Sequence, residues 1–193
     1  MTANPRTLRD LGAYWASQGG LNLGVVGSLR THCRGYHLGR DRIYGPVACR
    51  PGGVARPGLG DADYSVRTAR DRAGLSNAAS AIDLGRLDGS LEQLRAFSRW
   101  LVGRCRANRP GTSDIREVIY SPDGRSVLRW DRERGPSSAP RSGEADDSHL
   151  THTHISFYRD SEGRDKRPLL APYFRRKLAA VSAASRAAAP AGA

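Results

Sequence analysis

The segment from residue 90 to residue 131 carries the clearest periodicity in the chain and therefore limits the fold most. Ser90 followed three places later by Gln93 is a helix-capping pattern, and apolar residues then line one face of a helix that we expect to end near Ala107. Directly after it, "REVIYSPDGRSVLRWD" has two apolar strands around a Pro-Asp-Gly turn, which predicts a β-hairpin over 116–131. We therefore predict an α+β fold with a small antiparallel sheet, flanked by helices and long loops.

Weaker patterns elsewhere predict the remaining elements. They are a short helix from Thr7, a buried strand at 21–29, a short strand at 80–85, a strand at 150–159 and a helical start to the segment after Arg167. Two stretches lack periodicity and are expected to be loops: 30–75, rich in Gly, Pro and Arg, and 132–148, which is polar.

The length of 193 residues fits one domain. We expect a helical N-terminal segment over 1–20 and a single domain over 21–178. The Ala/Pro-rich composition of 179–193 predicts a disordered tail.

Charge and composition narrow the class of protein. The formal charge is +12, and all but two of the 31 basic residues are Arg, which predicts attraction to polyanions, either nucleic acid or an anionic cell wall. No helix-turn-helix, zinc finger or RNA-binding motif is visible, so we expect no specific nucleic-acid partner. Three cysteines without CxxC spacing argue against a disulfide framework and against a zinc knuckle.

The start of the chain has no signal-peptide pattern. Its first twenty residues lack an apolar core, and no apolar run approaches the roughly 18 residues that span a bilayer. We expect cytoplasmic synthesis, no membrane insertion and a monomer.

All five histidines fall in two clusters. His32 and His37 lie in "RTHCRGYHLGRDRIYG", and His149, His152 and His154 lie in "DDSHLTHTHISFYRD". Because side chains alternate along a strand, His152 and His154 are expected to point to the same side. Two imidazoles so placed can approach one metal ion or one substrate atom.

A carboxylate lies between the two clusters. Asp83 ends the otherwise apolar "NAASAID", where a buried charge is costly unless it is paired, hydrogen-bonded or bound to a metal. One Asp with one His from each cluster would form a three-ligand zinc site with an open fourth position, the arrangement of catalytic zinc.

These residues carry a resemblance. The order of a His, "SAIDLG", a helix, a hairpin and "HTH" on a strand resembles the zinc peptidases of the D-Ala-D-Ala carboxypeptidase and Hedgehog superfamily, which includes the L-alanyl-D-glutamate endopeptidases of phage lysis. "HLTHTHISFYRDSE" also resembles uncharacterised proteins of actinobacterial phages and prophages. The resemblance spans roughly residues 25–160. It implies a Zn²⁺ ion bound by Asp83 and His154, with His152 assisting catalysis.

The chain departs from this family at the first ligand. The family places a His seven residues before the Asp, where this chain has Ser76. The missing ligand must come from the first His cluster. We favour His37, because "YHLGRD" has the pattern of a fixed turn, and His32 stays the alternative.

The sequence leaves open which of several carboxylates is the general base. Asp147 and Asp146 precede His152 by five and six residues, near where the family carries an acidic residue, and we favour Asp147. Glu117 on the hairpin is the alternative. His154 with Ser156 also forms an H-x-S pair, half of a two-histidine phosphoesterase signature, but the chain has no second such pair.

The resemblance implies a zinc-dependent peptidase that hydrolyses stem or cross-bridge peptides of peptidoglycan, similar to a phage lysin. It would act at the cell wall after release or as a virion component. Arg40 and Arg42 would hold carboxylates of the wall peptide, or be plain surface charges. The alternatives are a non-catalytic phage or prophage protein of the same fold, structural or wall-binding, and a basic nucleic-acid binder.

Overall fold

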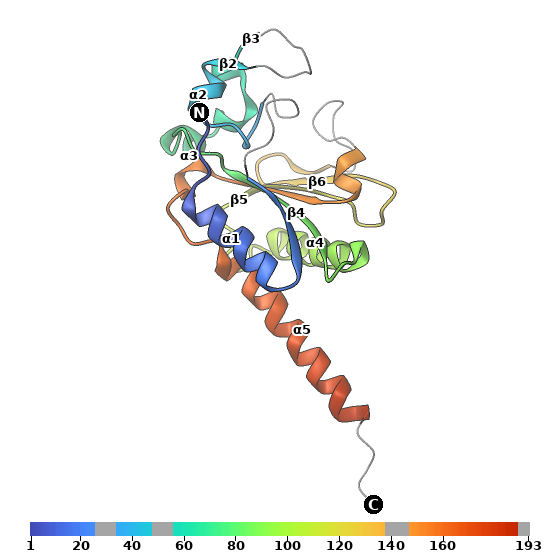
Figure 1. Ribbon diagram of the computed structural model, residues 1–193. Coiled ribbons are helices and arrows are strands. Elements are labelled where there is room, and N and C mark those ends of the chain that lie inside the picture. The colour runs from blue at the N-terminus through green and yellow to red at the C-terminus, as the bar shows by residue number, and fades with distance from the viewer. Residues whose placement is uncertain (26–33, 48–55, 138–146, 189–193) are drawn as a thin grey trace, which may run out of the picture.

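The computed structural model describes residues 1–25, 34–47, 56–137 and 147–188. Its centre is a six-stranded antiparallel sheet with the strand order β1-β4-β8-β5-β6-β7 (Figure 1). The strands of this sheet are β1 (Gly20–Gly24), β4 (Ala81–Leu87), β5 (Ile115–Tyr120), β6 (Leu128–Asp131), β7 (Gly135–Ser137) and β8 (Thr153–Phe157). A separate two-stranded sheet pairs β2 (Pro46–Val47) with β3 (Arg56–Pro57).

Five α-helices accompany the sheets in the described part of the chain, which confirms the predicted α+β class. They are α1 (Arg6–Ser17), α2 (Arg40–Ile43), α3 (Ala69–Ala73), α4 (Leu91–Arg106) and α5 (Arg167–Ala188). Short 3₁₀ turns lie at η1 (Gly60–Ala62), η2 (Tyr64–Val66), η3 (Asp147–Leu150) and η4 (Arg159–Ser161). Among the described residues, no helix has the length and apolar character needed to cross a membrane.

One face of the main sheet packs against helices α1, α4 and the first part of α5 (Figure 1). Trp15 of α1 is the centre of this core: its ring centroid lies 4.7 Å from that of Phe97 on α4 and 5.7 Å from that of Phe174 on α5. Ile82 and Leu84 of β4 belong to the same apolar cluster. Burying aromatic side chains of this size stabilises the fold by removing a large apolar area from water.

The opposite face of the sheet carries polar side chains. Because successive residues of a strand point to opposite faces, Asp83 lies opposite its apolar neighbours on β4, and His154 does so on β8. The segment with α2, β2 and β3 lies on this side of the sheet, away from α1 and α4 (Figure 1). A small second core of Leu38, Ile43 and Val66 fixes this segment.

The predicted helix and hairpin are both confirmed. The Ser90 hydroxyl accepts a hydrogen bond from the Gln93 amide at 3.3 Å, as a helix cap does. The hairpin pairs β5 with β6 from Glu117–Asp131 to Tyr120–Leu128. At its tip, Gly124 has a φ of +79°, a conformation that favours glycine.

Three predicted segments differ from the structure. The buried strand expected at 21–29 corresponds over its first residues to β1, which is mostly exposed because it lies at the edge of the sheet; residues 26–29 lie outside the described part. Residues 132–148, expected to be a loop, contain β7, which pairs with β6 once Gly135 turns the chain with a φ of +75°. Residues 30–75, also expected to be a loop, contain α2, α3 and the small second sheet.

Several other predictions concern the ends of the chain and its cysteines. Helix α5 extends to Ala188 and so includes part of the segment 179–193 for which composition predicts disorder; residues 189–193 lie outside the described part. Cys105 is free and buried in α4, and Cys33 and Cys49 lie outside the described residues.

Candidate metal centre

Two of the expected ligands face each other across neighbouring strands. Asp83 on β4 and His154 on β8 are register partners in the antiparallel ladder. Side chains of directly opposed residues lie on the same face of a sheet with their Cβ atoms close together. The Nδ1 atom of His154 therefore reaches to 3.0 Å from Oδ1 of Asp83.

The third expected ligand comes from the loop before α2. His37 is 3% exposed, and its Nδ1 atom lies 2.5 Å from the carbonyl oxygen of Val25. The loop is fixed beside the start of β4, because the carbonyl of Tyr36 accepts a hydrogen bond from the Ser80 amide at 2.6 Å. This attachment brings His37 to the polar face of the sheet.

The three side chains converge. Nε2 of His37 lies 3.0 Å from Nδ1 of His154 and 3.3 Å from Oδ2 of Asp83. His37, Asp83 and His154 each offer one ligand atom within 4.8 Å of the others, so together they can hold a metal ion. The structure thus brings together the three residues selected from the sequence. The alternative ligand, His32, lies outside the described residues.

The outer contacts of both histidines determine which ring nitrogen carries the proton. The carbonyl of Val25 can only accept, so Nδ1 of His37 carries a hydrogen and Nε2 presents a lone pair. The single hydroxyl proton of Ser156 is donated to Glu117 at 2.9 Å, so this hydroxyl accepts from Nε2 of His154, 2.7 Å away. In the neutral form of His154, Nδ1 then also presents a lone pair, whereas in the charged form Nδ1 donates to Asp83.

When both rings are neutral, the lone pairs of His37 Nε2 and His154 Nδ1 therefore lie next to the Asp83 carboxylate in a buried site. Nitrogen lone pairs 3.0 Å apart repel each other unless a cation, either a proton or a metal ion, lies between them. Metal-bound histidines are held in the same way, with the second ring nitrogen donating to a carbonyl or a carboxylate-linked group. The inner and outer contacts of the triad are therefore compatible with a bound metal ion.

Behind His154 lies a buried carboxylate. Glu117 on β5 is register partner of Ser156, and its carboxylate accepts from Ser156 and, at 3.0 Å, from the hydroxyl of Tyr64. Its other oxygen binds the guanidinium of Arg129. Burial opposes ionisation of Glu117, but contacts with His154, Arg129 and Ser156 outweigh it and hold its pKa below the usual range.

The triad is electrostatically coupled. Burial raises the pKa of Asp83, yet His37 and His154 outweigh this effect and hold that pKa well below its usual value. For His154, burial disfavours the charged form, but Asp83 and Glu117 raise its pKa to about 9. The site therefore attracts one positive charge, which a bound metal ion would supply in place of the proton.

His152 lies beside the triad. Its Nε2 atom is 3.8 Å from Oδ1 of Asp83, the same oxygen that contacts His154, so the two histidines face the same carboxylate as expected. Burial lowers the pKa of His152, and the charge of Asp83 only partly opposes this. The ring of His149 lies against that of His152, with centroids 4.5 Å apart.

The proposed general bases lie in different surroundings. Asp147 is exposed at the start of η3, and it does not belong to the three-residue metal group. Asp146 lies outside the described residues. Glu117 is completely buried and faces the Nε2 side of His154, away from Asp83, so its contacts are those of a residue that orients His154.

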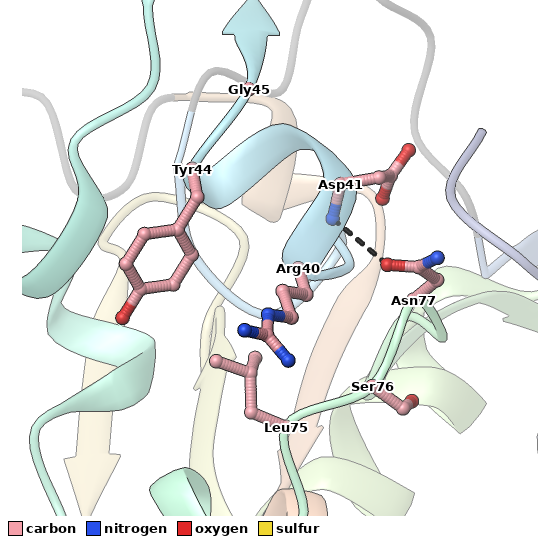
Figure 2. A pocket seen from close by; sticks show the side chains of 7 residues that line it. All are labelled: Arg40, Asp41, Tyr44, Gly45, Leu75, Ser76 and Asn77. Carbon is pink, nitrogen blue, oxygen red and sulfur yellow. Dashed lines mark hydrogen bonds between the residues drawn. The ribbon is translucent and has the colours of Figure 1, made fainter.

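Ser76, the position where the resembling family has a histidine, lies apart from the triad. Its hydroxyl donates to Glu162 at 2.6 Å and accepts from the amide of Ala78 at 2.9 Å. Figure 2 shows Ser76 on the segment that lines an open pocket, with its hydroxyl pointing away from Arg40. The residues that line this pocket are Arg40, Asp41, Tyr44, Gly45, Leu75, Ser76 and Asn77, and none belongs to the triad.

Sequence reasoning missed the buried polar residues around the triad. Tyr64, Ser156 and Arg159 were not selected as site residues, although each contacts a ligand, its orienting carboxylate or its loop. Ser156 had a usable signal, because it lies two residues after His154 and so points to the same face of β8. Tyr64 and Arg159 had none, since their contacts join segments far apart in the sequence.

Comparison of the chain with protein-family models, curated proteins and solved structures found no match. The geometry of the triad is therefore the basis for a functional assignment.

Proposed function

We propose that the chain is a zinc-dependent peptidase that hydrolyses stem or cross-bridge peptide bonds of peptidoglycan, in the manner of a phage lysin. The observation that carries the proposal is the convergence of Nε2 of His37, Nδ1 of His154 and the Asp83 carboxylate, with both rings held by outer contacts in the ligating tautomer. Imidazole and carboxylate are ligands that suit zinc.

The number of ligands supports catalysis over a structural role. Structural zinc sites are closed by four protein ligands, commonly cysteines, whereas catalytic sites use three and keep one position open. Among the described residues, the triad supplies three ligands, and Asp83 keeps 16% of its side chain exposed, so the site is reachable from solvent. A zinc ion held by His37, Asp83 and His154 would supply Lewis-acid chemistry, polarising a scissile carbonyl and activating a water.

Two residues are proposed to act on the reacting groups. His152 lies beside Asp83, and burial lowers its pKa; it is close enough to the triad to hold or transfer a proton or to stabilise a developing oxyanion. Asp147 is the proposed general base on its sequence position alone. Its exposed place on η3, a few residues before His152, means that it would have to turn toward the site when substrate binds.

The substrate class is supported by charge and by the resemblance of the HTH segment. A net charge of +12 favours an anionic polymer such as the bacterial wall. Arg40 is exposed in the open pocket and is available to a peptide carboxylate (Figure 2). Arg42 is only partly exposed.

The test combines metal content with wall digestion. Protein purified with zinc present is expected to retain about one equivalent, and less than about a tenth of an equivalent would contradict the proposal. Incubation with purified peptidoglycan is expected to release peptides with new termini, identified by mass spectrometry. His154→Ala and Asp83→Asn should lose both zinc and cleavage.

The outcomes also separate the alternative functions. Zinc binding with wall binding but without cleavage would favour a non-catalytic wall-binding protein. Affinity for DNA that falls steeply with salt would favour a nucleic-acid binder. Asp10→Asn, on α1 and outside both the triad and the pocket of Figure 2, is the matched control and should keep zinc and cleavage.

A further inference from the structure

A buried arginine lies behind the loop that supplies His37. Arg159 follows His154 by five residues, in η4, and is 2% exposed. In the described part of the chain its guanidinium forms hydrogen bonds and no ion pair. The backbone amide of Arg159, and not its guanidinium, donates to the carboxylate of Asp71, at 3.2 Å. Burying a guanidinium is costly unless its donors are satisfied, so its hydrogen bonds indicate what it does.

Those hydrogen bonds connect the Arg159 guanidinium to the loop that carries His37 and to the residues that precede β4. One terminal nitrogen donates to the carbonyl of Leu38 at 3.0 Å and, at 3.4 Å, to that of Gly35, so its two carbonyl partners bracket His37. The other terminal nitrogen donates to the carbonyl of Ala78 at 3.3 Å, a few residues before Asp83. A single planar group thus joins the loop to the strand that carries another ligand.

A second set of contacts fixes the same loop from the other side. The carboxylate of Asp63 accepts from the amide of Gly35 at 3.0 Å and from the amide of Ser65 at 2.9 Å. Ser65 in turn accepts from Arg159 through its carbonyl at 3.0 Å and its hydroxyl at 2.8 Å. Arg159 is therefore the centre of the contacts that hold residues 35–38, which lie in no helix or strand.

We propose that Arg159 is a positioning residue for the metal centre, holding the 35–38 loop so that Nε2 of His37 faces Asp83 and His154. The inference rests on the metal site proposed above. Asp83 and His154 are fixed by the paired strands β4 and β8, whereas His37 depends on its loop. Without the guanidinium, the loop would have to be ordered when the metal binds, and that loss of conformational entropy would weaken metal affinity.

The test compares Arg159→Met with Lys166→Met in the full chain. Lys166 is a matched control because it is also a buried cation, 4% exposed, but it donates to Ser161 at 2.6 Å and contacts no residue of the loop. Zinc affinity is measured by competition with a chromophoric chelator. Arg159→Met is expected to bind zinc at least ~10-fold more weakly than wild type, and Lys166→Met within about 2-fold, since outer contacts of metal ligands typically contribute 10–100-fold.

A metal-free measurement separates this proposal from the metal site itself. The ¹⁵N chemical shifts of the His37 ring report its tautomer, and amide hydrogen exchange reports the order of residues 35–38. Arg159→Met is expected to lose the single tautomer and the protection of the loop amides. If wild type binds no zinc, the proposed function fails. These two signals alone then decide whether Arg159 positions His37.

Two results would overturn the positioning role. One is wild-type zinc affinity in Arg159→Met, which would leave the metal site intact. The other is an unchanged His37 ring and unchanged loop exchange. If Arg159→Met does not fold, Arg159→Lys replaces it. An ammonium cannot reach all the acceptors of the planar guanidinium, so we expect zinc affinity between ~2-fold and ~10-fold weaker than that of wild type. Zinc affinity equal to that of wild type would overturn the proposal.

Discussion

Ser156 lies two residues after His154 on the same face of β8, and its hydroxyl is 2.7 Å from Nε2 of His154. Because this hydroxyl donates its proton to Glu117, it accepts from His154 and leaves Nδ1 free to bind a metal. The pair therefore selects the tautomer of the ligand. The H-x-S pattern, which in sequence suggested half of a phosphoesterase signature, orients a ligand here.

Replacement of Ser156 by alanine should weaken metal binding. The Nε2 hydrogen of His154 would lose its acceptor, and the ring would be free to change tautomer. We expect zinc affinity to fall by about 10-fold or more, as for other residues that orient metal-bound histidines. Chelator competition measures the affinity. Ser98→Ala is the control, because Ser98 is also buried and bonded to β8 through Thr153, and it should bind zinc normally.

Replacement of Glu117 by glutamine should destabilise the fold. The change removes the ion pair between the buried Arg129 and Glu117, while Asp131 stays 3.1 Å from the guanidinium. Breaking a buried ion pair in this way typically costs about 3 kcal/mol or more in the free energy of unfolding. Urea denaturation of the metal-free protein measures it. Glu92→Gln, which breaks an exposed pair with Arg99, should leave stability unchanged, and equal losses in both variants would refute the role of burial.

The sequence predicted elements where local patterns are strong. The capped helix at α4 and the hairpin of β5 and β6 follow from spacing within about forty residues, and both are present. Asp83 and His154 were identified because a carboxylate and an HxH pair are unusual in apolar strands. Their pairing across β4 and β8 is a tertiary relationship that the sequence does not encode locally.

The buried residues that surround the triad could not be predicted from the sequence in the same way. Tyr64 and Arg159 contact the site region across more than fifty residues, and nothing in their local sequence distinguishes them from surface residues. Choosing His37 depended on recognising a turn, whereas its position depends on Arg159, Asp63 and Ser80. Local patterns therefore locate the ligands, and long-range packing determines whether they converge.

His152 should affect catalysis without affecting metal binding. It faces Asp83 at 3.8 Å but lies outside the three-ligand group. We expect His152→Ala to keep its zinc and to lower the rate of peptide release by about 100-fold, the lower end for loss of a proton-transferring group. Loss of zinc together with activity would instead make His152 a ligand.

Asp147→Asn tests the proposed base in the same assay. A fall of similar size with zinc retained is expected if Asp147 turns toward the site during the reaction. An unchanged rate would remove Asp147 from the mechanism and leave His152 as the proton carrier. Asp160→Asn, remote from η3, controls for the loss of a carboxylate of comparable exposure to solvent.

The stability of the fold in acid should depend on Asp114, which joins the start of β5 to the segment before α5. Its carboxylate accepts from Arg70 at 2.9 Å and from Arg164 at 2.8 Å, and Lys166 lies 3.5 Å away. Burial opposes ionisation, but these three cations outweigh it and lower the pKa of Asp114 to about 2.

The sign of the effect follows from the direction of this shift. The pKa of Asp114 is lower in the folded state than in the unfolded state, near 4. Its contribution is therefore fully present above about pH 4 and is lost as the pH falls toward 2, a difference of roughly 2 kcal/mol. Asp114→Asn should be less stable than wild type by about that amount at pH 5 and equal to it near pH 2, as measured by urea denaturation. Asp10→Asn, in an exposed pair with Arg6, should match wild type at both pH values. A wild-type advantage over Asp114→Asn that persists at pH 2 would show that Asp114 stabilises the fold through packing and not through its charge.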